Sequence, residues 1–153
     1  MEKEIGSQRK ILKVNLIGQV LLKKGYIASA QLEEGLDIQK REGGFLGEVL
    51  IKKGFVSEEL FTAALVNQLD VAYLPVESYT ISKNVLNLIP KDLAYKYCFI
   101  PLERIGDVLT VAIANPLDLK AIEQIEIITT CKIVCLLGKR TEIEECLNKY
   151  YQN

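Results

Sequence analysis

A segment of 24 residues occurs twice in this chain, and it constrains the fold more than any other feature of the sequence. The first copy starts at Leu16 and the second at Phe45, with the five residues 40–44 (KREGG) between them. The copies read LIGQVLLKKGYIASAQLEEGLDIQ and FLGEVLIKKGFVSEELFTAALVNQ. Glycine, leucine and glutamine recur in one register without a gap, which indicates an internal duplication.

Each copy predicts two short helices joined by a turn. Asn15, just before the first copy, can cap a helix, and Gly25 follows two lysines, as at a helix C-terminus where φ must become positive. A second helix is expected from about Ser29, and the second copy repeats this plan. A single pair of short helices cannot bury its apolar face alone, so the two copies are expected to pack together as one four-helix subdomain.

Gly18 and Gly47 occupy the first turn of a predicted helix in their respective copies. Glycine at such a place costs about 1 kcal/mol relative to alanine, so its recurrence needs a reason. Two interpretations are open. Either another helix packs closely there, or a ligand approaches the backbone closely.

The pattern changes after Gln68. Residues 70–83 contain Pro75 and several hydroxyl residues, which predicts a linker of extended segments. Strands are expected at 98–103, 108–114 and 132–137. Helices are expected at 85–89, at 91–97 and from the turn that ends at Asp118 to about 129. A last helix is expected to begin with a capping box of Thr141 and Glu144 and to end at 151. The predicted fold class is α+β. Its parts are a flexible lead-in at 1–14, a duplicated helical-pair subdomain at 15–69, the linker at 70–83 and a small three-stranded α/β subdomain at 84–153.

Composition excludes several classes of protein. The 153 residues are 49% apolar, which suits one globular domain or two small subdomains. A net charge of −1 argues against a nucleic-acid binder or a polybasic membrane binder. No apolar run approaches the roughly 18 residues of a membrane span, and the polar, mixed-charge N-terminus does not predict a signal peptide.

The sequence also lacks the residues that common catalytic sites need. It has no histidine and no GxxxxGK[ST] phosphate loop, so neither a His-based triad nor ATP hydrolysis is expected of this chain. The four cysteines are spaced wrongly for a zinc site, which favours buried, reduced thiols over a metal or redox role. No metal or cofactor is predicted. The paired carboxylates, such as Glu33 with Glu34, are interpreted as solvated helix faces.

The duplicated segment resembles the tandem motif of the MshEN family, the N-terminal domain of type II secretion and type IV pilus assembly ATPases. That motif begins with Arg-Leu-Gly, ends with Gln and occurs twice, five residues apart. The second half of the chain also resembles this domain, in IPKDLAYKYCFIPL and VAIANPLDL, so the resemblance covers about Asn15 to Tyr151. Some members of the family bind cyclic di-GMP along the double motif. The resemblance therefore implies a candidate ligand-binding set: Leu16, Ile17, Gly18, Leu21, Leu22, Gly25, Leu32, Leu36, Gln39, Phe45, Leu46, Gly47, Leu50, Ile51, Gly54, Phe61, Leu65, Gln68 and, for the donor edge of guanine, Asp118.

This chain departs from the family at its most ligand-specific positions. Leu16 and Phe45 stand where the motif has arginine, and Tyr26, Phe55 and Phe61 replace aliphatic residues. An arginine fork suits guanine or phosphate, and no neutral side chain supplies the same bonds. Cyclic di-GMP is therefore expected to bind weakly or not at all, in the groove beside the two motif glycines if it binds.

The resemblance implies two functions. The first is a non-catalytic regulatory and docking domain, which couples a secretion or pilus ATPase to the cytoplasmic part of an inner-membrane platform protein. The second is a cyclic di-GMP receptor that passes its signal to the motor. A third function, that of an enzyme in its own right, has little support, because the sequence contains no nucleophile–base pair and no set of metal ligands. The expected partners are that platform protein and the ATPase domain of a longer chain, with no nucleic acid and no direct membrane insertion. The expected location is the cytoplasm, peripheral to the inner membrane through the partner.

Overall fold

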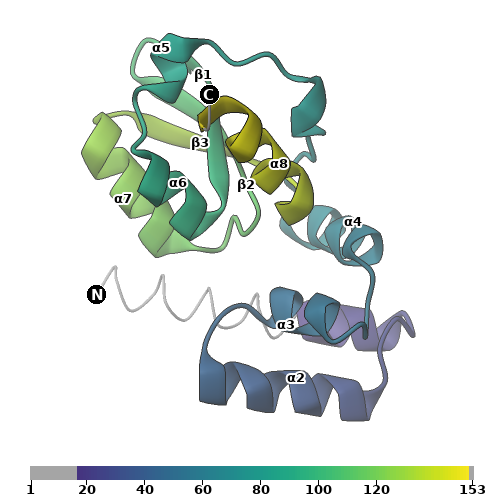
Figure 1. The fold of residues 1–153 in the computed structure, drawn as a ribbon. Coiled ribbons are helices and arrows are strands. Elements are labelled where there is room, and N and C mark those ends of the chain that lie inside the picture. The colour runs from purple at the N-terminus through teal and green to yellow at the C-terminus, as the bar shows by residue number, and fades with distance from the viewer. Residues whose placement is uncertain (1–16, 152–153) are drawn as a thin grey trace. The chain divides into compact units, whose positions relative to one another are not determined.

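The structure, a computed structural model, describes residues 17–151 of the chain. The chain divides into two compact units, which meet in the sequence between Asp70 and Val71. The described part of the N-terminal unit is 17–70, and that of the C-terminal unit is 71–151. Figure 1 shows that the first unit is helical and that all three strands lie in the second.

The N-terminal unit consists of two helical pairs. Residues 17–23 are helical and precede α2 (Ser29–Glu42), while α3 (Leu46–Lys52) precedes α4 (Glu58–Leu69). Ser57 caps α4, because its hydroxyl oxygen accepts a hydrogen bond of 3.2 Å from the backbone N–H of Leu60. Helix α3 contacts both α2 and α4, so the two copies share one core. At its centre the equivalent residues Leu21 and Leu50 are both fully buried.

The C-terminal unit is a three-stranded sheet with helices packed on it. Strands β1 (Phe99–Ile105) and β2 (Val108–Ile113) are antiparallel, and β3 (Lys132–Leu137) lies parallel to β2 at the other edge. Parallel pairing needs a crossover, which α7 (Leu119–Thr129) supplies. The remaining helices are η1 (Val76–Ser78), α5 (Lys83–Leu86), α6 (Lys91–Tyr97) and α8 (Arg140–Tyr151). Figure 1 labels α5, α6 and α8.

The core of the C-terminal unit joins the sheet to α7 and α8. Phe99 and Ile113, which face each other across β1 and β2, are fully buried. Ile125 of α7 and Leu147 of α8 belong to the same cluster and are also fully buried. Burial of each such side chain contributes about 1.5–3 kcal/mol, so this cluster is the main source of stability in the unit.

The structure differs from the linker expected at residues 70–83. Val76 is fully buried and Ile81 is buried, and both belong to the core of the C-terminal unit. The backbone N–H of Leu74 donates to the carbonyl of Leu137 at 2.9 Å, and the N–H of Leu137 donates to the carbonyl of Ala72 at 2.8 Å. Pro75 interrupts these bonds only after the segment has joined the edge of the sheet. Burial of its apolar residues and pairing with the edge of the sheet therefore fix this segment on the C-terminal unit, although its composition is typical of a loop.

Several helices end at a residue in the left-handed conformation. In the N-terminal unit Gly25 and Gly54 both have φ of 75°, a value that glycine adopts without strain. In contrast, α4, α6 and α7 are followed by Asp70, Cys98 and Thr130, with φ of 53°, 49° and 56°. Among residues 17–151 no helix is both long enough and apolar enough to cross a membrane.

Candidate functional site

The two copies of the motif share one backbone geometry at the end of their first helix. At each end three backbone hydrogen bonds close the helix, with lengths of 3.0, 3.0 and 2.9 Å in both copies. The donors and acceptors correspond pair by pair at an offset of 29 residues, and Gly25 and Gly54 have the same φ. The donor N–H groups belong to Lys24, Gly25 and Tyr26 and to Lys53, Gly54 and Phe55. The duplication in sequence is therefore a duplication of local structure.

About half of the motif residues form the interior of the N-terminal unit. Their side chains, or for glycine their backbone, are almost removed from solvent, so they stabilise the scaffold and offer little surface to a ligand. The buried motif residues are Ile17, Gly18, Leu21, Leu32, Leu46, Gly47, Leu50 and Leu65.

The other motif residues keep part of their surface accessible. These are the residues that a ligand on the motif could contact directly, while the buried ones would hold them in place. The half-buried residues are Leu22, Leu36, Gln39, Phe45, Ile51, Phe61 and Gln68, and the exposed ones are Gly25 and Gly54. Leu16, at the first arginine position, lies outside the described residues.

Close packing explains the two glycines of the helix starts. A methyl group added at Gly18 would lie 3.1 Å from Cδ1 of Leu32, and one added at Gly47 would overlap the ring of Phe61, whose Cε2 is 2.8 Å away. Leu32 and Phe61 occupy the same position of the second helix in their copies. Of the two interpretations, approach by another helix describes the contacts at both glycines. The space beside Gly47 is filled by Phe61, where the family motif has a leucine.

Gln39 fixes the spacer between the copies. Its side-chain amide donates to the carbonyl of Gly44 at 3.2 Å, and its backbone carbonyl accepts from the N–H of Gly43 at 2.8 Å. Gly43 and Gly44 have φ of 76° and 89°, a conformation that other residues rarely adopt. The glutamine that ends the first copy therefore sets where the second copy begins.

A groove with a volume of about 540 Å³ runs along α3 and the C-terminal end of α2. Phe45, at the second arginine position, lines this groove beside the glycine spacer. Both signs of charge border it, and Lys53 forms an exposed ion pair of 3.7 Å with Glu34 of α2. The lining residues are Ile38, Glu42, Gly43, Gly44, Phe45, Glu48, Val49, Lys52 and Lys53. Volumes of this size accommodate small ligands in other proteins.

Two residues of this region were not singled out from the sequence. Gly35 is buried, and a methyl group added there would lie 2.8 Å from Cδ2 of Leu50. Ile38 is also buried and lines the groove, whereas Leu36 between them is only half-buried. The signal was the small residue at the equivalent position of the second copy, Ala64, which is buried as well.

Asp118 belongs to the C-terminal unit, and its carboxylate caps α7. An oxygen of this buried carboxylate accepts a hydrogen bond of 3.2 Å from the backbone N–H of Ala121. The preceding turn is held in a similar way, because the side-chain oxygen of Asn115 accepts from the N–H of Leu117 at 3.0 Å. Asp118 thus has a structural role as the N-cap that its position in the sequence predicts.

The four cysteines are free thiols, all in the C-terminal unit. Cys98, Cys131 and Cys146 are buried and Cys135 is half-buried. Among residues 17–151 no three cysteine, aspartate or glutamate side chains are grouped so that they could hold a metal ion. It remains a prediction that the four thiols are reduced and that removal of metal does not change the stability of the protein.

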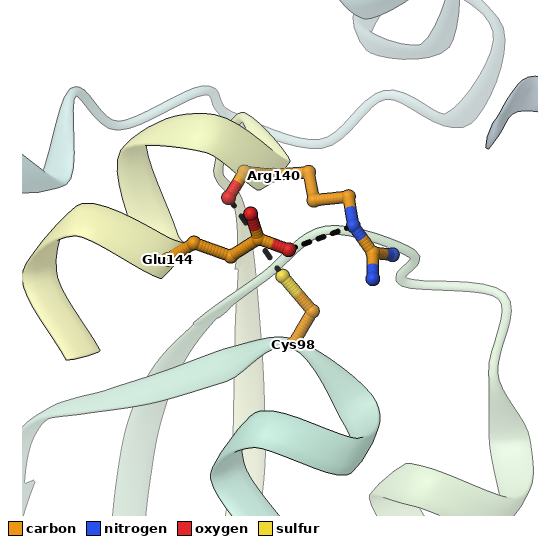
Figure 2. A network of polar contacts seen from close by, with 3 residues as sticks. All are labelled: Cys98, Arg140 and Glu144. Carbon is orange, nitrogen blue, oxygen red and sulfur yellow. Dashed lines mark hydrogen bonds and ion pairs between the residues drawn. The ribbon is translucent and has the colours of Figure 1, made fainter. Parts of the chain in front are cut away.

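Cys98 links the end of α6 to the start of α8. Its thiol donates to the carbonyl oxygen of Arg140 over 3.9 Å, and the guanidinium Nε of Arg140 lies 3.0 Å from the carboxylate of Glu144, as Figure 2 shows. The ion pair is exposed and spans one helical turn, so it contributes about 0.3–0.5 kcal/mol. This network has the features of a structural contact.

The half-buried thiol of Cys135 is expected to make the stability of the fold depend on alkaline pH. Burial, and next the charge of Glu126, raise its pKa from 9.0 to about 11. Below pH 9.0 the folded and unfolded chains both hold the proton. Between pH 9.0 and about 11 only the folded chain keeps it, so the free energy of unfolding falls as pH rises through this window.

Urea unfolding at a series of pH values measures this effect. Cys135→Ala is expected to make the fall between pH 9.0 and about 11 shallower. Leu136→Ala, on the same strand, is the control: it lowers stability at every pH and leaves the slope unchanged. Equal slopes for the native chain and Cys135→Ala would contradict the prediction.

Comparisons with known proteins give one consistent result. The family model of the MshEN domain matches residues 69–153. The type IV pilus assembly ATPase PilB of Myxococcus xanthus is 26% identical over 135 residues, which are 88% of this chain and 24% of PilB. The chain thus spans about a quarter of the length of this curated relative.

Two solved structures share the fold. A structure of MshE with cdg, cyclic di-GMP, is 27% identical, with a TM-score of 0.72 and coverage of 88% of this chain and 98% of that one. The N-terminal domain of XpsE is 18% identical, with a TM-score of 0.74 and coverage of 88% and 92%. At that identity the likeness to XpsE concerns the fold alone.

Proposed function

Because the chain belongs to the MshEN domain family, we propose that it is the non-catalytic N-terminal regulatory and docking domain of a type II secretion or type IV pilus assembly ATPase. The observation that carries this proposal is the match to PilB, in which 88% of this chain aligns with only 24% of a pilus assembly ATPase. The domain would couple the motor to the cytoplasmic part of an inner-membrane platform protein. It would then act in the cytoplasm, at the inner membrane through that partner.

The chemistry of the chain agrees with a role outside catalysis. The sequence lacks the phosphate loop on which motor ATPases depend, so in this proposal a different domain would supply the motor. The described surface offers apolar side chains instead. On α7, the adjacent residues Ile127 and Ile128 are 63% and 43% exposed, so a partner protein could bury apolar surface there.

A second candidate function is reception of cyclic di-GMP. The structure of MshE with this ligand, 27% identical to the chain, favours it. The repeated backbone geometry and the groove that Phe45 lines also support it. The charged fork that would hold guanine or phosphate is replaced by Leu16 and Phe45, so the affinity is expected to be low. The two functions are compatible, because a ligand on the N-terminal unit could regulate docking.

The docking function predicts a direct complex. Titration of the 153-residue chain with the purified cytoplasmic part of the platform protein, followed by calorimetry, should give saturable binding. Ile127→Asp is expected to reduce the affinity at least about tenfold, because it places a charge in an apolar contact.

Asn84→Asp is the matched control, since Asn84 is exposed on α5, outside α7, and receives the same charge. Its affinity should stay close to that of the native chain. A chain that shows no binding at all to the platform protein would contradict the docking function. If the affinity of Ile127→Asp equalled that of the native chain, the contact with the platform protein would not involve Ile127 of α7.

A further inference from the structure

One half of a sheet face in the C-terminal unit is not covered by any of the helices that the structure describes in that unit. The pairing register places Ile105, Val108 and Lys132 side by side across β1, β2 and β3. The next row on the same face consists of Glu103, Thr110 and Val134. Residues that face each other across paired strands, and residues two apart along a strand, project from one face. We call these six residues the open half-face.

Burial distinguishes the open half-face from its surroundings. Ile105, the last residue of β1, is 70% exposed, and Val134 in β3 is 47% exposed, so both present apolar surface that a partner could cover. Residues of β2 that point to the opposite face, such as Leu109, are fully buried. Farther along the same face Ala112 is also fully buried, and it borders Gly138 together with Ile143 of α8. The cover of this face therefore ends before the two rows begin.

Charges and apolar groups occupy opposite corners of the open half-face. Glu103 and Lys132 stand at the two ends of one diagonal, and Ile105 and Val134 stand at the ends of the other. A flip of this pattern about the diagonal from Ile105 to Val134 exchanges the acid with the base and leaves each aliphatic residue in its own place. A surface of this kind can be complementary to a copy of itself.

We propose that the open half-face is a contact between two copies of this chain, stacked face to face about a two-fold axis along the diagonal from Ile105 to Val134. This axis places Ile105 and Val134 each on its own counterpart. It places Glu103 opposite Lys132 of the partner subunit, and Lys132 opposite Glu103 of the partner subunit. The strands of the two sheets then cross at roughly 90°, one of the two preferred angles for sheets that pack face to face.

The other simple two-fold axes fit less well. An axis along the strands, or one across them, places each charged residue against an aliphatic residue. The remaining diagonal places Glu103 against Glu103 of the partner subunit and Lys132 against Lys132 of the partner subunit, which repel. The charge pattern therefore selects both the partner, a second copy, and its orientation. Six side chains from each copy make a small interface, so the dimer is weak and depends on concentration.

Charge reversal tests this contact. Sedimentation equilibrium of the chain over a concentration series should show a monomer–dimer equilibrium. Glu103→Lys and Lys132→Glu each create two like-charge pairs, so each should lower the association constant at least about tenfold. The double variant Glu103→Lys with Lys132→Glu restores both opposite-charge pairs, and its association constant should return close to the native value.

Reversals elsewhere on the unit control for net charge. Lys120 and Glu123 are exposed on α7, and Lys120→Glu and Glu123→Lys make the same changes of charge away from the open half-face. These variants should associate like the native chain, and circular dichroism should show that all variants fold. A native chain that stays monomeric at every concentration would overturn the proposal and leave the face to a different protein. A double variant as weak as the single ones would overturn it as well.

Discussion

Replacement of both Leu16 and Phe45 by arginine is expected to raise the affinity for cyclic di-GMP by about two to four decades. Each arginine can add a charged hydrogen bond worth about 1.5–3 kcal/mol, and two such bonds add about 3–6 kcal/mol if they are additive. Phe45 already lines a groove of about 540 Å³ beside the glycine spacer, so an arginine there starts from a residue that borders open space. Calorimetric titration of the native chain and of the double variant measures the gain.

A single arginine variant measures the contribution of one position to the gain in affinity, and a third variant is the control. Phe45→Arg alone should gain about one to two decades. Leu60→Arg adds the same charge at a residue of α4 that is 40% exposed and lies outside the candidate ligand-binding set, so it should gain little. Submicromolar binding by the native chain would refute the expectation of weak binding and point to other residues, such as Arg41. No gain in the double variant would mean that the groove no longer fits the ligand.

Replacement of Leu50 by alanine is expected to destabilise the N-terminal unit by about 2–5 kcal/mol. The side chain is fully buried and borders Gly35 of α2, so its loss leaves a cavity between helices that close packing holds in place. Leu21 occupies the same position in the first copy and is also fully buried, so Leu21→Ala should cost a similar amount. Urea unfolding followed by circular dichroism measures both free energies.

Leu36→Ala is the matched control. Leu36 is half-buried, so the same change of side chain removes fewer contacts and should cost less than either of the other two. A cost for Leu36→Ala equal to that for Leu50→Ala would show that burial does not decide the outcome here. Unequal costs at Leu21 and Leu50 would show that the two copies contribute differently to their shared core.

Much of the fold follows from the sequence, because its signals are local. The repeat predicts two helical pairs, and the apolar run at Lys132–Leu137 predicts β3 with the bounds that the structure has. Predictions fail where a distant partner decides. Residues 71–83 have the composition of a loop, yet edge pairing and burial of Val76 place them in the C-terminal unit. Likewise β1 extends to Ile105 because β2 pairs with it, and α8 begins at Arg140, so Thr141 lies inside the helix.

The candidate site was less predictable, since a motif does not state which of its members face inward. The rotation of α2 about its axis buries Gly35 and Ile38 and leaves Leu36 half-buried, and that rotation depends on the fit of α2 against α3. The same holds for Gly47. Its sequence position is compatible with a ligand or a helix, and only the place of the Phe61 ring distinguishes the two. The ligand-binding set itself remains a prediction.

The left-handed residues at the helix ends limit how stable this sequence can be. Asp70, Cys98 and Thr130 adopt positive φ without being glycine, and for the β-branched Thr130 this conformation is a strained one. Glycine at these places would adopt the same backbone without a steric penalty. The sequence therefore lies below the greatest stability that its own backbone allows. Substitution by glycine at these helix ends, which lie outside the tandem motif, would raise the stability of the fold. The protein could then tolerate destabilising substitutions in the motif that change its ligand or its partner.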